Sequence, residues 1–182
     1  MNNIERLAKL MQGWGYLEDP APAAALRWIE LFLVAYGGQL ENLEDAAPLI
    51  EALRAEACTV PALELERLRS RSVLFFLDTI SQYVDSQEEL RDLPLEHDIT
   101  EIAKEFGFES SDALDAVRVA LTGRHDGPPL ELLFPLLGHE RIMMRVGAIS
   151  SHLLHGRGLE PIKYGPDGQP FETLTPKLDG CG

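Results

Sequence analysis

The fold of this chain is decided by residues 114–146, which read LDAVRVALTGRHDGPPLELLFPLLGHERIMMRV. Apolar residues recur at helical spacing over Ala113–Thr122, and the pattern stops at Gly123, the residue type that most often ends a helix. Pro128-Pro129 then opens a second helical pattern over Leu130–Leu137, because proline is favoured in the first turn of a helix. The stretch therefore predicts two short helices joined by a loop.

A third helix is predicted immediately downstream. Gly138 separates the second helix from Glu140–His155, whose apolar residues form a stripe with the period of an α-helix. The stripe consists of Ile142, Val146, Ile149 and Leu153.

The chain upstream of this stretch shows the same alternation of helical periodicity with glycine, proline or a capping residue. The predicted helices are Ile4–Met11 capped by Asn3, Ala23–Tyr36, Asn42–Ala57, a stretch after Val60-Pro61 that runs to Val84 with a break near Ser70 and Ser72, Gln87–Leu93, and Ile99–Phe106 capped by Asp98. Ala23–Tyr36 is apolar almost all round, which predicts that it lies buried between other helices. Aromatic residues at helical spacing, namely Trp14, Trp28, Phe75 and Phe76, are expected in the core. We therefore expect an all-α helical bundle.

The composition changes from Gly156 onward. Ile162–Tyr164 and Phe171–Leu174 flank the turn-forming residues Gly165–Gln169, which is the pattern of a small hairpin. A tethered or disordered tail explains the same residues equally well, because an isolated hairpin is only marginally stable in water. We divide the chain into residues 1–22 (first helix and linker), 23–97 and 98–156 (two helical subdomains) and 157–182 (tail).

Charge and composition exclude several classes of protein. The 182 residues include 30 acidic and 16 basic side chains, giving a net charge of −14, which does not suit non-specific binding to DNA or to a membrane. No apolar run approaches the roughly 20 residues that span a bilayer. Only two cysteines occur, Cys58 and Cys181, so we expect a cytoplasmic chain rather than a disulfide-stabilised one.

The charge is unevenly distributed along the chain. Residues 1–115 hold nine basic and 23 acidic side chains, whereas residues 116–157 hold five arginines against three acidic residues. Four of the five histidines also fall in this second segment: His125, His139, His152 and His155. An anionic ligand is therefore expected to contact residues 116–157.

Motifs for catalysis are not found in the sequence. Neither of the glycine-rich nucleotide-binding patterns occurs, and neither cysteine has a second ligand at metal-binding spacing. His152 and His155 can share a helix face, but a surface pair explains them better than a metal site, since no third ligand stands nearby. We expect no enzyme activity, no metal and no cofactor.

One segment carries a resemblance to a known family. Arg118–Gly123 (RVALTG), Gly127-Pro128, Leu137-Gly138, Glu140 and Arg145, with Ile102–Gly107 (IAKEFG) upstream, resemble the C-terminal anticodon-binding region of bacterial glutamyl-tRNA synthetases. The motifs lie between residues 102 and 146, and a looser match in helix order extends over residues 23–155. The resemblance implies the all-helical anticodon-binding fold, described as an α-helix cage, and tRNA as a partner.

The sequence also departs from the family pattern. The catalytic half of a class I synthetase, with its His-Ile-Gly-His and Lys-Met-Ser-Lys-Ser signatures, has no counterpart. His139 stands where the family usually has lysine, and Ala116 where it often has proline. The tail beyond Gly156 has no counterpart in the family.

The resemblance implies that five cationic residues bind RNA: Arg118, Arg124, His125, Arg141 and Arg145. A guanidinium can form bidentate hydrogen bonds and stack on unpaired bases. Structural roles are the alternative for the helical arginines. Arg118 can pair with Asp115 or Glu131 to join two helices, and Arg145 can pair with Glu140 or join Arg141 in a cationic surface.

Two functions from different classes follow. The chain is expected to be a free-standing, non-catalytic module that binds tRNA, of the tRNA-Glu type. It would assist a truncated synthetase-like partner in trans or form part of a split glutamate–tRNA ligase, and a fragment of a longer synthetase is a related alternative. The alternative is an acidic adaptor of synthetase ancestry that binds proteins through features such as Met143-Met144 and the Gly165–Gly168 turn, and no longer binds RNA. An exposed cluster of three or more of the arginines favours RNA, and their burial in ion pairs favours the adaptor.

Overall fold

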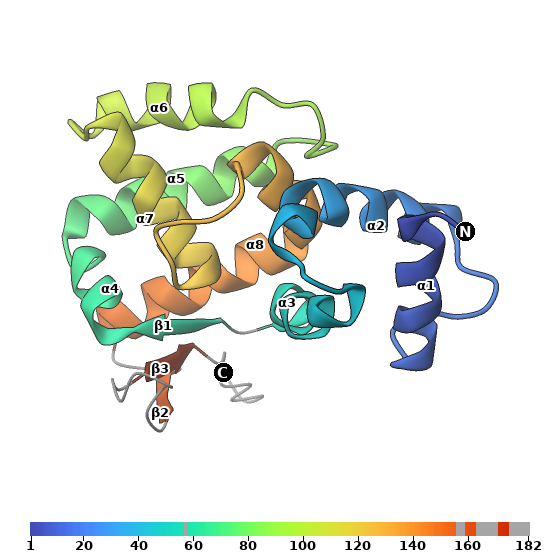
Figure 1. Ribbon diagram of the computed structural model, residues 1–182. Coiled ribbons are helices and arrows are strands. Elements are labelled where there is room, and N and C mark those ends of the chain that lie inside the picture. The colour runs from blue at the N-terminus through green and yellow to red at the C-terminus, as the bar shows by residue number, and fades with distance from the viewer. Residues whose placement is uncertain (57, 156–158, 163–170, 175–182) are drawn as a thin grey trace, which may run out of the picture. The chain divides into compact units, whose positions relative to one another are not determined.

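The computed structural model describes residues 1–56, 58–155, 159–162 and 171–174 (Figure 1). The chain divides into two compact units, Met1–Ala55 and Glu56–Gly182. This division falls inside the range 23–97 that the sequence predicts as one subdomain. The first three predicted helices therefore form a unit of their own.

The N-terminal unit is built only of helical elements. These are α1 (Asn3–Gly13), α2 (Ala23–Tyr36), the 3₁₀ turns η1 (Gly37–Gln39) and η2 (Leu43–Asp45), and α3 (Ala46–Arg54). Their buried side chains include Leu7 and Met11 of α1, Phe32 of α2 and Ile50 of α3. The Phe32 ring stacks between the rings of Trp28 and Tyr36, with centroids 5.5 and 5.2 Å apart.

Two sequence predictions for this unit need correction. The cap of α1 is Asn2 rather than Asn3, because Asn2 and Glu5 form a reciprocal capping box with hydrogen bonds of 2.9 and 3.1 Å. The predicted limits of α2 are confirmed, but its burial on all sides is wrong. Only Ile29, Phe32 and Tyr36 form its buried stripe, while Val34 is exposed.

The C-terminal unit contains the predicted loop, which follows Thr122 and ends before Leu130. Its elements are β1 (Thr59–Pro61), α4 (Ala62–Arg67), α5 (Arg71–Asp85), α6 (Leu95–Glu105), α7 (Ser110–Thr122), α8 (Leu130–His155), β2 (Leu159–Ile162) and β3 (Phe171–Leu174). Helices α5, α7 and α8 pack on one another, and α6 packs against each of the three (Figure 1). The buried Phe76 of α5 meets the rings of Phe106 and Phe108 edge-on, at 5.9 and 5.5 Å.

Two predicted helix breaks are confirmed. Ser70 caps α5 by accepting a hydrogen bond from the Val73 amide at 3.2 Å, which separates α4 from α5. Gly138 interrupts α8 with φ 80° and ψ 163°, so that Leu130–Leu137 and the residues from His139 onward form two helical segments. A backbone at this φ is readily adopted by glycine, and the change of direction occurs where the sequence places one.

The predicted helix Gln87–Leu93 is wrong, because this segment forms turns and Asp92 has a positive φ of 58°. Asp98 is also not a cap. Helix α6 starts earlier, at Leu95 after Pro94, and the Asp98 carboxylate instead accepts a hydrogen bond of 2.6 Å from the Tyr83 hydroxyl.

A three-stranded antiparallel sheet accompanies the helices. Its strand order is β1-β3-β2, with Thr59 opposite Thr173 and Leu159 opposite Leu174. Strands β2 and β3 confirm the hairpin interpretation for their own residues, although β2 begins upstream of the predicted run Ile162–Tyr164 and shares only Ile162 with it. The predicted turn at Gly165–Gln169 lies outside the described residues. The fold is an all-α bundle with this small sheet added.

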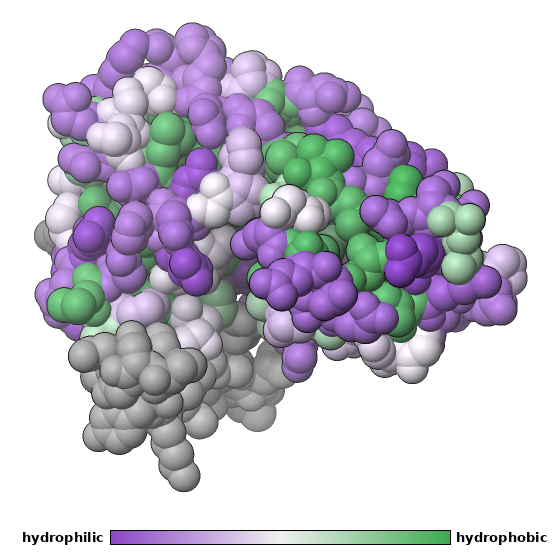
Figure 2. All heavy atoms as spheres, viewed as in Figure 1, coloured by the Kyte–Doolittle hydropathy of each residue, from purple (hydrophilic) through white to green (hydrophobic). Residues whose placement is uncertain are grey.

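Apolar side chains also reach the surface. Hydrophobic residues emerge as patches between hydrophilic ones on the face shown in Figure 2. Phe75 is 60% exposed, so its predicted place in the core is wrong, whereas Phe76 is fully buried as predicted. Within the described ranges, no helix has the length and apolar character needed to cross a membrane.

Candidate nucleic-acid interface

The end of α7 is fixed by Gly123. Its φ of 75° lies in the left-handed region, and its amide donates a 2.9 Å hydrogen bond to the Val119 carbonyl. A Cβ on this residue would overlap the carbonyl oxygen of Thr59 in β1. Glycine is therefore required here both by backbone conformation and by the close approach of β1.

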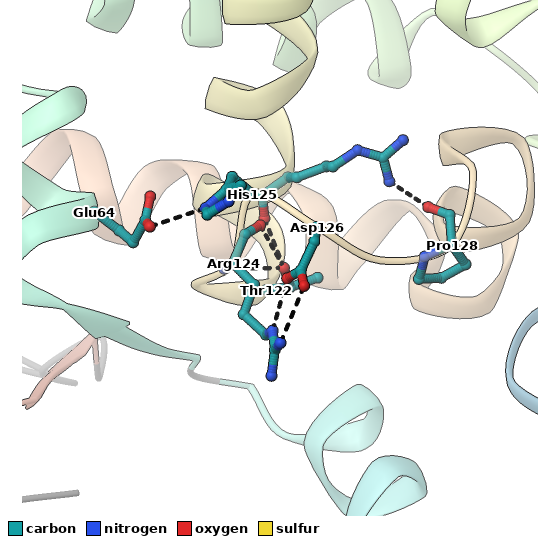
Figure 3. A network of polar contacts seen from close by, with 7 residues as sticks. Glu64, Thr122, Arg124, His125, Asp126 and Pro128 are labelled. Carbon is teal, nitrogen blue, oxygen red and sulfur yellow. Dashed lines mark hydrogen bonds and ion pairs between the residues drawn. The ribbon is translucent and has the colours of Figure 1, made fainter. Parts of the chain in front are cut away.

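Thr122 shapes the start of the following loop, which comprises residues 123–129. Its hydroxyl donates to the Arg118 carbonyl at 2.8 Å and accepts from the Arg124 amide at 3.2 Å (Figure 3). The side chain thus caps the last turn of α7 and holds the first loop residue. The last two residues of the RVALTG motif, Thr122 and Gly123, therefore end α7 and begin the loop.

Arg118 holds three elements of the C-terminal unit together. Its guanidinium donates to the carbonyl of Pro128, just before α8, and lies 3.4 Å from the carboxylate of Glu96 in α6. The Glu96 amide in turn donates to the Glu131 carboxylate in the first turn of α8 at 3.1 Å. The side chain of Arg118 is only 14% exposed, so the structure uses it as a tie between α6, α7 and α8.

The partner of Arg118 therefore differs from those expected. The sequence suggested Asp115 or Glu131, but Glu96 takes this place, and Glu131 participates only through the Glu96 backbone.

Arg145 lies in the interior. It is 2% exposed and donates a 2.6 Å hydrogen bond to the Leu121 carbonyl in the last turn of α7. Burial raises the pKa of the neighbouring Cys58 thiol to about 11, although the charge of Arg145 opposes this rise. Neither sequence alternative for Arg145, a pair with Glu140 or a cationic surface with Arg141, matches this position. An enclosed guanidinium is not available for direct contact with RNA.

Arg124 and His125 are displayed by the loop. Arg124 is 72% exposed and forms a two-pronged ion pair with Asp126, at 2.9 and 3.2 Å. The guanidinium lowers the pKa of the Asp126 carboxyl, mainly through this hydrogen bond. His125 Nδ1 lies 2.9 Å from the Glu64 carboxylate of α4 (Figure 3).

The remaining candidates lie along α8. Arg141 is half-buried and takes part in polar or electrostatic contacts. His139, which replaces the family lysine, donates from Nε2 to the Gln87 carbonyl at 2.7 Å and so joins α8 to the segment after α5. Met143 is half-buried, with its sulfur 3.0 Å from the Ser81 hydroxyl of α5, so it packs within the unit.

The structure thus divides the five predicted RNA-binding residues. It exposes Arg124 and His125, leaves Arg118 and Arg141 partly buried and buries Arg145. The sequence analysis expected either an exposed cluster of three or more arginines or their burial in ion pairs. The structure matches neither expectation in full.

Two carboxylates of this region were not found from the sequence. Glu64 and Glu96 lie 61 and 22 positions from His125 and Arg118, the basic residues that they contact. No local motif marks such pairs, because only the packing of α4 and α6 against the α7 region brings them together. Among the residues that the structure describes, no group of three or more His, Cys, Asp or Glu side chains is placed to hold a metal ion.

Comparison with known proteins assigns the chain to a family. The anticodon binding domain family matches residues 6–149. Similar proteins include glutamate–tRNA ligase 1 of Rubrobacter xylanophilus, 33% identical over 78% of this chain and 32% of the relative. The glutamate–tRNA ligases of Alkaliphilus metalliredigens and Desulforamulus reducens are 25% and 20% identical, over 77% and 80% of this chain and 29% and 31% of their own lengths. The chain spans about a third of the length of these curated relatives. The chain belongs to the anticodon binding domain family.

Proposed function

We propose that this chain binds the anticodon loop of a tRNA. The observation that carries the proposal is the family match over residues 6–149, which includes both the loop 123–129 and the helices that hold it. The proposal adds that the module itself carries out no aminoacylation.

Arg124, His125 and Arg141 are the residues that we propose to contact RNA. The first two are exposed on a loop, where side chains can follow the irregular backbone of unpaired nucleotides. Arg118 and Arg145 would act indirectly, by fixing the ends of α7 and α8 between which the loop runs. Affinity would come from a few phosphate contacts, and specificity from base edges and stacking.

The charge of the protein sets the expected strength of binding. With a net charge of −14, long-range repulsion opposes the approach of RNA, and a few local cations must overcome it. Moderate affinity with a shallow salt dependence is therefore expected, with a slope of about −2 for three phosphate contacts on a single strand.

The finer proposal concerns the tRNA and the setting. The similarity to glutamate–tRNA ligases supports a tRNA of the tRNA-Glu type. The relatives are about three times as long as the matched region, which supports action together with a catalytic part, whether in trans, in a split ligase or within a longer chain.

The test is a fluorescence-anisotropy titration of a labelled tRNA-Glu transcript with the protein at several salt concentrations. Wild type should bind saturably and more weakly as salt rises. Arg124→Ala combined with Arg141→Ala should weaken binding about ten-fold or more, because charge-assisted hydrogen bonds are lost.

Arg27→Ala combined with Arg91→Ala is the matched control, because it also removes two arginines, both exposed and neither proposed to contact RNA. A tRNA with a different anticodon tests the finer proposal. If no variant or wild type binds tRNA at tens of micromolar protein and low salt, the proposal is wrong and the protein-binding adaptor takes its place.

A further inference from the structure

The exposed basic side chains of the loop are already engaged by carboxylates. Arg124 holds Asp126 through two hydrogen bonds, and His125 holds Glu64 at 2.9 Å. Any anion that binds these two side chains must therefore compete with carboxylates that the protein itself supplies.

The Arg124–Asp126 pair reproduces the geometry of phosphate binding. Nε and one Nη of Arg124 face the two oxygens of the Asp126 carboxylate, at 2.9 and 3.2 Å. A guanidinium presents this same fork to two oxygens of a phosphate. A phosphate and the Asp126 carboxylate are thus alternative occupants of one donor set.

Glu64 plays the corresponding part for His125 from another element. It belongs to α4, its side chain is only 15% exposed, and its second oxygen lies 3.4 Å from Nε of Arg67. The contact with His125 is therefore a tertiary contact between α4 and the loop, in contrast to the local pair Arg124–Asp126.

We propose that Glu64 and Asp126 are internal competitors for the RNA phosphates and so determine which RNA this surface accepts. The surface consists of Glu64 of α4 and residues 124–126, and its occupant is the phosphate backbone of unpaired RNA. This inference rests on the proposed tRNA binding.

The arrangement has a consequence for specificity. An isolated phosphate gains little by displacing one carboxylate, because one ion pair replaces another. Two consecutive phosphates of one RNA segment displace both carboxylates at once. The entropic cost of immobilising the RNA then arises only once for the two contacts. The surface therefore selects a strand that presents adjacent phosphates to adjacent residues, and weak non-specific anion binding is suppressed.

The test compares the affinities of isosteric amide variants for tRNA-Glu by the anisotropy titration. Glu64→Gln and Asp126→Asn remove the competing charge but keep the shape and a hydrogen-bond acceptor. Each should bind the tRNA about two- to five-fold more tightly than wild type, because the RNA no longer has to displace a charged carboxylate.

Glu66→Gln is the matched control. Glu66 stands on the same helix as Glu64, but its carboxylate pairs at 2.6 Å with Arg69, outside the proposed surface. It removes the same charge without releasing Arg124 or His125. Urea unfolding of each variant confirms that the affinities compare folded proteins.

A double-mutant cycle tests whether Glu64 acts on RNA affinity through His125. In a His125→Ala background, Glu64→Gln should raise the affinity less than it does in the wild-type background, because only Arg67 is still released, whereas Asp126→Asn should keep its full effect. The inference is overturned, and tRNA binding stands, if wild type binds but Glu64→Gln and Asp126→Asn bind no more tightly than Glu66→Gln. If no variant or wild type binds tRNA, both the inference and the proposed function are overturned.

Discussion

The last turns of α7 and the loop that follows differ in the burial of their basic side chains. On the helical side of Gly123, Arg118 is mostly enclosed, and the incoming Arg145 of α8 is buried against the Leu121 carbonyl. On the loop side, Arg124 and His125 reach solvent and hold carboxylates. Gly123 therefore separates arginines that hold the helices together from basic side chains that are exposed to solvent.

The difference teaches how to interpret arginines in a family motif. Arg118 and Arg145 both belong to the motif, yet their donors face backbone carbonyls of the unit itself. A guanidinium has five donors in a fixed plane, and this makes it as effective at tying helix ends together as at binding phosphate. Burial and partner decide between the two roles, and neither can be read from the motif.

The largest effect is expected at the boundary itself. Gly123→Ala should lower the free energy of unfolding by about 3 kcal/mol or more, because the new Cβ meets the Thr59 backbone in addition to the cost of positive φ. Gly107→Ala is the matched control: it has the same φ of 75° but open space around its Cβ, and should cost only about 1 kcal/mol. Urea unfolding measures both. Equal losses would mean that β1 does not confine the end of α7.

Arg145 should be the next most sensitive residue. Arg145→Ala leaves the Leu121 carbonyl without this donor and opens a void, so the free energy of unfolding should fall by about 2–3 kcal/mol. Arg91→Ala, which removes an exposed arginine, should change it by less than about 0.5 kcal/mol. Indistinguishable urea midpoints for the two variants would contradict the framing role of Arg145.

Cys58 provides a pH-dependent measure of the same enclosed region. Its thiol has a folded-state pKa of about 11 against an ordinary 9.0, so the unfolded chain loses this proton first as the pH rises. Stability from the buried neutral thiol is therefore present below pH 9 and lost between pH 9 and 11. From pH 8 to pH 10, wild type should lose about 1 kcal/mol more than Cys58→Ala. Parallel stability–pH curves for the two proteins would show that Cys58 is hydrated.

Much of this architecture could be predicted from local sequence. The limits of α2 agree with the prediction to the residue, and Ser70 and Gly138 mark the breaks before α5 and within α8. These features depend on capping, glycine and proline, whose effects reach only a few residues along the chain. The loop between α7 and α8 was predicted for the same reason.

Features that depend on distant residues could not be predicted in this way. Strand β1 is only three residues long and exists because residues 171–173 pair with it. The contact of Glu64 with His125 and that of Glu96 with Arg118 likewise arise only when separate helices pack. The segment 87–93 shows the reverse case, in which residues with a helical pattern form turns, and the next helix, α6, begins only at Leu95.

The smallest effect on stability is expected in the loop, and it provides the sharpest check of the comparison. Arg124→Ala removes a 72% exposed side chain whose ion pair with Asp126 competes with water and salt, so the free energy of unfolding should change by less than about 0.5 kcal/mol. The change should shrink further in high salt, because exposed ion pairs are screened. Urea midpoints of wild type and variant, measured at low and high salt, test both statements. A loss as large as that of Arg145→Ala would show that the loop also holds the helices together, and that Arg124 is not available to a ligand.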